Sequence, residues 1–283
     1  MSATLHERAV LITGCSSGIG RCLALGLQQR GYRVFASARR PHDVAALAAA
    51  GLESLALDLD SPASIHRAVE ELLARTQGKL YALINNGAYG QPGAVEDLSR
   101  EVLREQFETN LFGPHELTCR LLPVFRAQGA GRIIQISSML GLVSLAYRGA
   151  YNASKYALEG LSDTLRLELA GSDIHVVLIE PGPIESRFRQ NAYAAFKANI
   201  DREHSAYREY YVEVERRLAG SKNQPFTLPP EAVLKKVVRA LVAGRPKPRY
   251  FVTFPTLLFA VLRRLLPTRW LDRVLWSVTG GGR

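Results

Sequence analysis

Tyr151 and Lys155 have the side-chain types and the spacing of a proton-transfer pair. The stretch around them has the pattern of a helix, in which residues four apart lie on the same face. A free phenol has a pKa of about 10, and a nearby ammonium stabilises its phenolate form. Ser138, thirteen residues before Tyr151, adds a hydroxyl that can hydrogen-bond a substrate oxygen. These side chains predict a site that gives a proton to an oxygen atom or removes one from it.

A glycine-rich segment near the start of the chain has the composition of a phosphate-binding loop. It runs from Thr13 to Gly20, with glycines at positions 14, 18 and 20, between an apolar strand and a helix. Glycines permit a tight turn and a close approach of the backbone to a ligand. The first N–H groups of a helix lack intrahelical acceptors and attract an anion such as a pyrophosphate. The alternative is a strand-helix turn without a ligand, but the position in the first such unit favours a nucleotide.

The elements that must position these residues alternate along the chain, with short apolar runs followed by amphipathic segments. We expect strands at Ala9–Ile12, Arg33–Ser37, Ser54–Leu57, Ala82–Ile84, Arg132–Ile136 and His175–Ile179. We expect helices at Gly18–Arg30, His42–Ala50, Pro62–Thr76, Arg100–Arg126, Ala150–Leu169 and Pro230–Ala243. Apolar strands that alternate with helices predict a parallel sheet with helices on both faces. Right-handed crossovers make this a doubly wound, Rossmann-type α/β fold of about seven strands in one domain.

The spacing TGxxxGxG resembles that of the short-chain dehydrogenase/reductase superfamily, and the superfamily's other motifs follow in order over roughly residues 8–190. They are Asn85-Asn86-Gly87-Ala88, Asn110, Ser138, Tyr151 with Lys155, and Pro181-Gly182. The segments after Ala88 and Ile179, with the C-terminal extension, look most like bacterial NADP-dependent aldehyde reductases and the hydroxysteroid and retinol dehydrogenases. The resemblance implies hydride transfer between a nicotinamide cofactor and an aldehyde, ketone or alcohol. The alternatives are a nucleotide sensor without turnover and an isomerase or dehydratase of the same superfamily.

The resemblance also assigns roles to single residues. Tyr151 would be the general acid or base, Ser138 would position the carbonyl oxygen, and Asn110 would hold a water linking Lys155 to solvent. The implied cofactor contacts are Gly14, Ser16, Ser17, Gly18, Ile19, Gly20, Arg39, Asp58, Leu59, Asn86, Gly87, Ala88, Tyr151, Lys155, Pro181, Gly182 and Ile184. One departure is Gly87-Ala88, where the superfamily usually has Ala-Gly. Alanine tolerates fewer backbone angles than glycine, which predicts an altered cofactor affinity.

The end of the second strand indicates which nicotinamide cofactor is used. Ala38 stands where the superfamily's NAD enzymes carry an aspartate, and Arg39 follows it. A guanidinium suits a 2′-phosphate, so we expect NADP, with NAD the less favoured choice. Arg39 could instead only solvate the strand end. Asp58 resembles the residue that contacts adenine, although a turn or helix-capping role is equally open.

The chain divides into a core at residues 1–186, a substrate lid at 187–227 and a C-terminal extension at 228–283. Aromatic residues of the predicted lid, among them Phe188 and Tyr193, suit an apolar substrate. The net charge of +10 lies entirely after residue 234, where eleven Lys and Arg face only Asp272. This distribution argues against a nucleic-acid partner and indicates an anionic one.

In the segment Phe251–Val278, arginines lie between large apolar residues. Its longest run without a charged residue is too short to span a bilayer. It could lie in a membrane interface, or pack on the protein's own core or on a second subunit; we expect the packing. Three cysteines without metal-type spacing and six scattered histidines predict no disulfide framework and no metal site. The N-terminus lacks the apolar run of a signal peptide, so we expect a cytoplasmic protein, with peripheral membrane contact left open.

Overall fold

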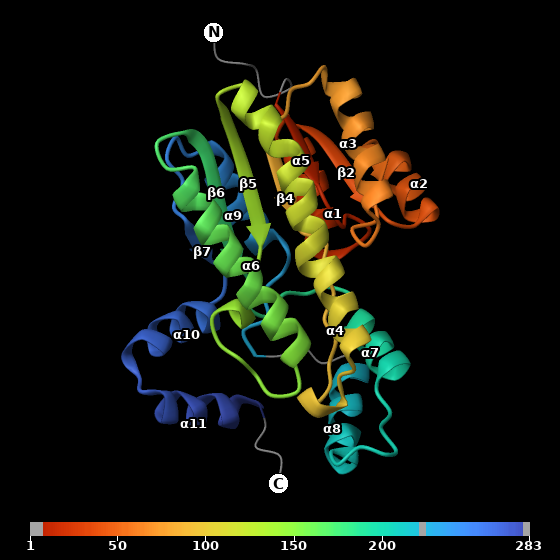
Figure 1. The fold of residues 1–283 in the computed structure, drawn as a ribbon, viewed down its shortest axis with the longest axis vertical. Coiled ribbons are helices and arrows are strands. Elements are labelled where there is room, and N and C mark those ends of the chain that lie inside the picture. The colour runs from red at the N-terminus through yellow and green to blue at the C-terminus, as the bar shows by residue number, and fades with distance from the viewer. Residues whose placement is uncertain (1–7, 221–224, 280–283) are drawn as a thin grey trace.

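The computed structural model describes residues 8–220 and 225–279, and Figure 1 shows their arrangement. In this part of the chain, parallel strands form one sheet in the order β3-β2-β1-β4-β5-β6-β7. The strands are β1 (Ala9–Ile12), β2 (Arg33–Ala38), β3 (Glu53–Ala56), β4 (Ala82–Asn85), β5 (Ala130–Ile136), β6 (Asp173–Glu180) and β7 (Arg249–Phe251). The doubly wound parallel sheet that the sequence predicted is confirmed.

Helices cover both faces of the sheet (Figure 1). One face carries α1 (Gly18–Gln28), α2 (Pro41–Ala49) and α9 (Glu231–Val242). The other carries α3 (Pro62–Thr76), α5 (Gly113–Ala127) and α6 (Gly149–Glu168). Strand side chains alternate between the two layers: Val10 and Ile12 join the first, and Ala9 and Leu11 join the second. Because successive residues of a strand point to opposite faces, a strand buried on both sides is apolar throughout.

The predicted helix Arg100–Arg126 is in fact three pieces. It consists of α4 (Arg100–Phe107), a π-helical turn at Glu108–Phe112, and α5. A π turn inserts an extra residue into an otherwise helical run, and such turns are frequent at functional sites. The apolar period continues across it, so the pattern alone could not reveal it. The turn carries Asn110, whose side chain is almost completely buried.

Two helical pairs lie beyond the carboxyl ends of the strands, on opposite sides (Figure 1). The predicted lid segment forms α7 (Phe188–Asn199) and α8 (Arg208–Ala219), which share a small apolar cluster with Ala94 and Leu98. The segment after β7 forms α10 (Phe254–Leu265) and α11 (Thr268–Thr279) rather than one continuous element. Pro267 explains the break, since proline disfavours helical angles in the residue before it, and Leu266 is extended.

Candidate active site

The glycine-rich loop lies where the strand order of the sheet reverses, between β1 and β4. In open α/β sheets this switch point leaves a crevice at the carboxyl ends of the strands, where ligands bind. Thr13 joins the two sides of the crevice. Its Oγ1 accepts hydrogen bonds from the backbone N–H groups of Asn86 (2.9 Å) and Gly87 (2.8 Å). Sequence reasoning did not single out Thr13 as a site residue, although it begins the glycine motif.

The glycines of the loop are required by close packing. Gly14 has a φ of +68°, and a Cβ there would lie 2.7 Å from the Cα of Gly87. A Cβ at Gly20 would lie 2.2 Å from the carbonyl oxygen of Gly14. The helix α1 that follows has Ser17 as its N-cap, with no hydrogen bond from that side chain to the helix. The first N–H groups of α1 are therefore not capped by a side chain, and a phosphate group fits the cradle.

The Gly87-Ala88 departure introduces no backbone strain. Ala88 is not one of the non-glycine residues that have a positive φ in the described part of the chain. At Gly87, before it, a Cβ would lie 2.8 Å from Cδ1 of Leu59, the movable end of a side chain. Neither residue has a positive φ, and the altered affinity stays a prediction.

Arg39 and Asp58 lie at the far end of the crevice, beyond β2 and β3. Arg39 is exposed, and its Nη1 lies 3.9 Å from Oδ2 of Asp60. The side chain of Asp58 accepts a hydrogen bond from the backbone N–H of Asp60 (3.2 Å), which is the turn role left open above. Ala38, at the end of β2, is buried. No carboxylate therefore projects from the end of β2 itself, and Arg39 is the nearest cation to that strand end in the sequence.

The structure brings Ser138, Tyr151 and Lys155 together. Ser138 follows β5, while the other two lie on the first turns of α6. The Lys155 Nζ lies 5.7 Å from the centre of the Tyr151 ring and donates a hydrogen bond to the carbonyl oxygen of Ile136 (2.8 Å). The neighbouring Ser137 is buried and lies with Glu159 beside Gly141, where a Cβ would be 3.0 Å from Oγ of Ser137 and 2.8 Å from Cγ of Glu159. Of the two adjacent serines, only Ser138 is therefore turned to Tyr151.

The protein environment moves the pKa values of both groups on α6. Desolvation raises the pKa of Tyr151 to about 12, opposed by a hydrogen bond from Ser138 and by the charge of Arg148. Desolvation lowers the pKa of Lys155 to about 8, opposed by the charge of Glu159. At neutral pH the phenol therefore keeps its proton and the ammonium keeps its charge. This is the state of a proton donor with a cation beside it.

Asn110 ties two parts of the site together. Its amide nitrogen donates to the carbonyl oxygen of Tyr89 (2.9 Å) and to Oγ of Ser154 (3.1 Å), and its oxygen accepts from the N–H of Tyr89 (3.1 Å). Ser154 in turn donates to the carbonyl oxygen of Tyr151 (2.9 Å). Asn110 therefore holds the first turn of α6 in place. Its role in binding a water stays a prediction.

The other predicted cofactor contacts come from segments near the carboxyl ends of β1 and β6. Ser16 and Ile19 belong to the glycine loop and α1, and Pro181, Gly182 and Ile184 follow β6. The loop after β6 closes over α1, since a Cβ at Gly18 would lie 2.9 Å from Cβ of Ser186. The carbonyl oxygen of Pro181 accepts a hydrogen bond from the N–H of Met139 (2.8 Å), which fixes this loop beside Ser138.

The surface around Tyr151 is apolar. The ring of Phe188, the first residue of α7, meets Tyr151 edge-on with the ring centres 5.2 Å apart. Tyr151 also packs against a cluster of buried residues from the loop after β5 and from the inner faces of α10 and α11: Met139, Leu140, Val143, Leu145, Phe259 and Leu275. A polar substrate would find few partners here, whereas an apolar one would be well covered.

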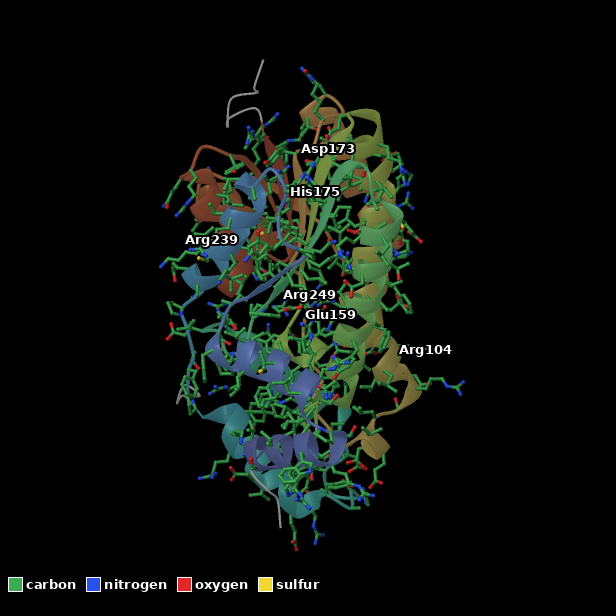
Figure 2. All side chains as sticks on the ribbon, turned by 90° about the vertical axis from the view of Figure 1, so that its left-hand side faces the viewer. Arg104, Glu159, Asp173, His175, Arg239 and Arg249 are labelled. Carbon is green, nitrogen blue, oxygen red and sulfur yellow. The ribbon has the colours of Figure 1, made fainter. Side chains whose placement is uncertain are left out.

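A buried group of charges lies directly behind the proton-transfer pair, and the sequence did not reveal it. Arg249 of β7 pairs with Glu159 of α6 and with Glu180 at the end of β6 (2.6 Å to Oε1), and Figure 2 shows Arg249 beside Glu159 in the middle of the molecule. Glu180 is completely buried, and burial raises its pKa to about 8. One available signal was the spacing of Glu159, four residues after Lys155, which places both on one face of α6.

Comparisons with known proteins agree with this geometry. The family model described as short chain dehydrogenase matches residues 8–196. The chain is 44% identical over 275 residues to the uncharacterized oxidoreductase YbbO of Escherichia coli, covering 97% of this chain and 96% of that one. It is 33% identical to the NADPH-dependent 3-dehydrocapnine reductase of Ornithobacterium rhinotracheale, covering 95% and 96%. A short-chain dehydrogenase structure from Streptomyces avermitilis superposes with a TM-score of 0.77 at 29% identity, covering 97% and 98%.

Proposed function

The chain belongs to the short-chain dehydrogenase/reductase superfamily, and from this premise we propose that it reduces an apolar aldehyde or ketone to an alcohol, or catalyses the reverse, with NADP(H). The observation that carries the proposal is the placement of Tyr151 beside Ser138 and Lys155, with an apolar wall around the phenol. A nucleotide sensor without turnover would have no need of a proton donor at this position.

Each protein group has a defined task in this proposal. The bound nicotinamide supplies or accepts the hydride. Ser138 donates a hydrogen bond to the substrate oxygen and holds it near the phenol. Tyr151 gives its proton to that oxygen in reduction and removes it in oxidation, and Lys155 stabilises the phenolate that is left. We further propose that α7 and α8 cover the substrate, because Phe188 already lies against Tyr151.

The preference for NADP rests on Arg39. Its guanidinium is exposed and only loosely paired with Asp60 at 3.9 Å, so a 2′-phosphate can compete for it. The similar reductase from Ornithobacterium is named as NADPH-dependent, which supports the same choice for this chain.

Arg39→Asp is expected to lower kcat/KM with NADPH and to shift the preference toward NADH. The substitution removes the cation and places a carboxylate where the ribose hydroxyls can donate to it. The measurement is kcat/KM with each cofactor, before and after. Arg40→Asp is the matched control, since it makes the same change of charge one residue further on. If both variants shift the ratio alike, the effect is general electrostatics and Arg39 does not bind the phosphate.

The test of the activity is a substrate panel followed at the nicotinamide absorbance. Short aldehydes, long-chain aldehydes, retinoids and steroids are each offered with NADPH, and the corresponding alcohols with NADP. We expect turnover to increase with the size of the apolar part of the substrate. Tight NADPH binding without turnover of any compound would favour the nucleotide sensor instead.

A further inference from the structure

Helix α10 is apolar on two opposite faces, and only one of them is covered. The inner face carries Thr256 and Phe259, which are buried, and it packs beside Tyr151. The outer face carries five exposed apolar side chains: Phe254 (59% exposed), Leu257 (50%), Leu258 (38%), Val261 (45%) and Leu265 (72%). Their spacing of three, four, seven and eleven residues from Phe254 puts them on one continuous stripe.

Helix α11 continues this surface with tryptophan and arginine. Its inner residue Leu275 is buried in the cluster that contains Tyr151. Its outer side carries Trp270 (61% exposed) and Trp276 (49%). The guanidinium of Arg273 lies 5.7 Å from the centre of the Trp270 ring, with Arg269 exposed nearby in the sequence. Tryptophan and arginine of this kind are typical of the boundary between lipid and water.

The charge of the two helices is strongly positive. They contain four arginines and a single acid, Asp272. Arg263 is exposed, and its Nη1 donates a hydrogen bond to the carbonyl oxygen of Leu142 (2.6 Å). Arg264, Arg269 and Arg273 are exposed, beside the apolar stripe. Two copies of the protein joined through this surface would bring like charges together, whereas an anionic surface would be attracted.

We propose that the outer side of α10 and α11 docks on an anionic membrane surface. We call this side the docking face: the α10 stripe, both tryptophans, and Arg264, Arg269 and Arg273. No helix in the described part of the chain is long and apolar enough to cross a bilayer. Helices of twelve residues with apolar and basic side chains suit a position flat in the headgroup region. In Figure 1 both helices lie at the margin of the molecule, beyond the carboxyl end of the sheet.

Docking there would link the membrane to the candidate active site. The inner sides of the same two helices share an apolar cluster with Tyr151. An apolar substrate dissolved in the bilayer would therefore be concentrated close to the site, which lies on the other side of the same two helices. This consequence rests on the proposed function, whereas the membrane contact stands on the docking face alone and is tested without turnover.

The chain provides its own probe, because its two tryptophans both lie on the docking face. Intact protein is mixed with vesicles of phosphatidylcholine alone or with about one quarter phosphatidylglycerol. We expect tryptophan emission to shift to the blue and to be quenched by brominated lipid, with the anionic vesicles. Raising the salt from about 0.05 M to about 0.5 M should weaken the binding, because surface attraction is screened.

Paired substitutions assign the binding to this surface. Leu257→Gln with Val261→Gln, and separately Arg264→Gln with Arg273→Gln, should each lower vesicle partitioning about tenfold or more. Leu167→Gln with Val212→Gln is the matched control, since both are exposed apolar residues on other helices (66% and 63%) and should leave partitioning unchanged. Circular dichroism of each variant excludes loss of fold.

Three results would overturn the proposal. The first is an absence of tryptophan shift with anionic vesicles at low salt. The second is equal partitioning of the Leu257→Gln, Val261→Gln variant and the control variant. The third is a protein that ignores vesicles but is a dimer in sedimentation, and becomes a monomer through the same two substitutions; the occupant would then be a second copy of the chain.

Discussion

Replacing Tyr151 with phenylalanine is expected to lower kcat about 10²–10⁴-fold while cofactor affinity stays the same. The phenylalanine ring keeps the edge-on contact with Phe188, whose ring centre lies 5.2 Å away, so the local packing survives. The transferable proton is lost. Because desolvation raises the pKa of Tyr151 to about 12, the phenol is the protonated form at neutral pH, as reduction requires. The measurement is kcat with the best substrate of the panel, together with a titration of NADPH binding.

Tyr156→Phe is the control for that experiment. Tyr156 lies on the same helix, and its hydroxyl donates a hydrogen bond to the carbonyl oxygen of Leu142 (2.8 Å). It should lose no more than a small part of kcat. Near-normal turnover by Tyr151→Phe would exclude this phenol as the acid. An equal loss in both variants would mean that the helix, and not the proton, was affected.

The parts of the site that the sequence could predict are those built by local structure. The strand, the glycine turn and the helix N-terminus from Thr13 to Gly20 are consecutive, so their residue types alone indicate a phosphate cradle. Tyr151 and Lys155 share one helical face for the same reason. The parallel sheet was also predictable, because strands such as Ala9–Ile12 are apolar at every position and must be buried on both sides.

What could not be predicted depends on contacts between distant segments. The apolar residues keep a helical spacing across the π turn at Asn110, so the sequence pattern does not reveal the turn. Arg249, the partner of buried Glu180, is brought to it by the pairing of β7 with β6, in which Leu178 lies opposite Arg249. The outer stripe of α10 is apolar in sequence just as the inner one is, and only the fold decides which of them is covered. For that segment the sequence favoured packing over a membrane position, and it could not show that each helix packs with one side and exposes the other.

The buried charges behind Lys155 carry the second large expectation. Arg249 bonds to Glu180 (2.6 Å), Asp163 (2.5 Å) and Glu159, and two of these carboxylates are almost completely buried. Among the described residues, one oxygen of Glu159 and one of Glu180 have no hydrogen-bond partner. The two acids thus depend on one guanidinium. Removing one partner of a buried ion pair costs far more than the pair itself contributes, because a charge is left without compensation.

Arg249→Met is therefore expected to lower the free energy of unfolding by about 3–5 kcal/mol, measured by urea unfolding at pH 7. Arg120→Met is the control, because Arg120 pairs with Glu116 at the surface and should cost less than about 1 kcal/mol. Adding Glu159→Gln to Arg249→Met should restore part of the loss, since it removes a buried carboxylate that Arg249 pairs with. A loss from Arg249→Met no larger than that of Arg120→Met would show that the cluster contributes nothing to the fold.

The pH dependence of the free energy of unfolding is a second test of the same cluster of charges. Burial raises the pKa of Glu180 to about 8 in the folded protein, whereas an unfolded glutamate titrates at about 4.3. Between those values the folded state holds a proton that the unfolded state has released, so this group's contribution to stability falls as pH rises toward 8. Arg249→Met removes the cation that lowers this pKa, so the fall in the variant's stability should continue to higher pH, while Glu180→Gln should flatten the curve. A profile unchanged by Glu180→Gln would mean that this carboxyl is ionised in the fold, and that Arg249 compensates both acids.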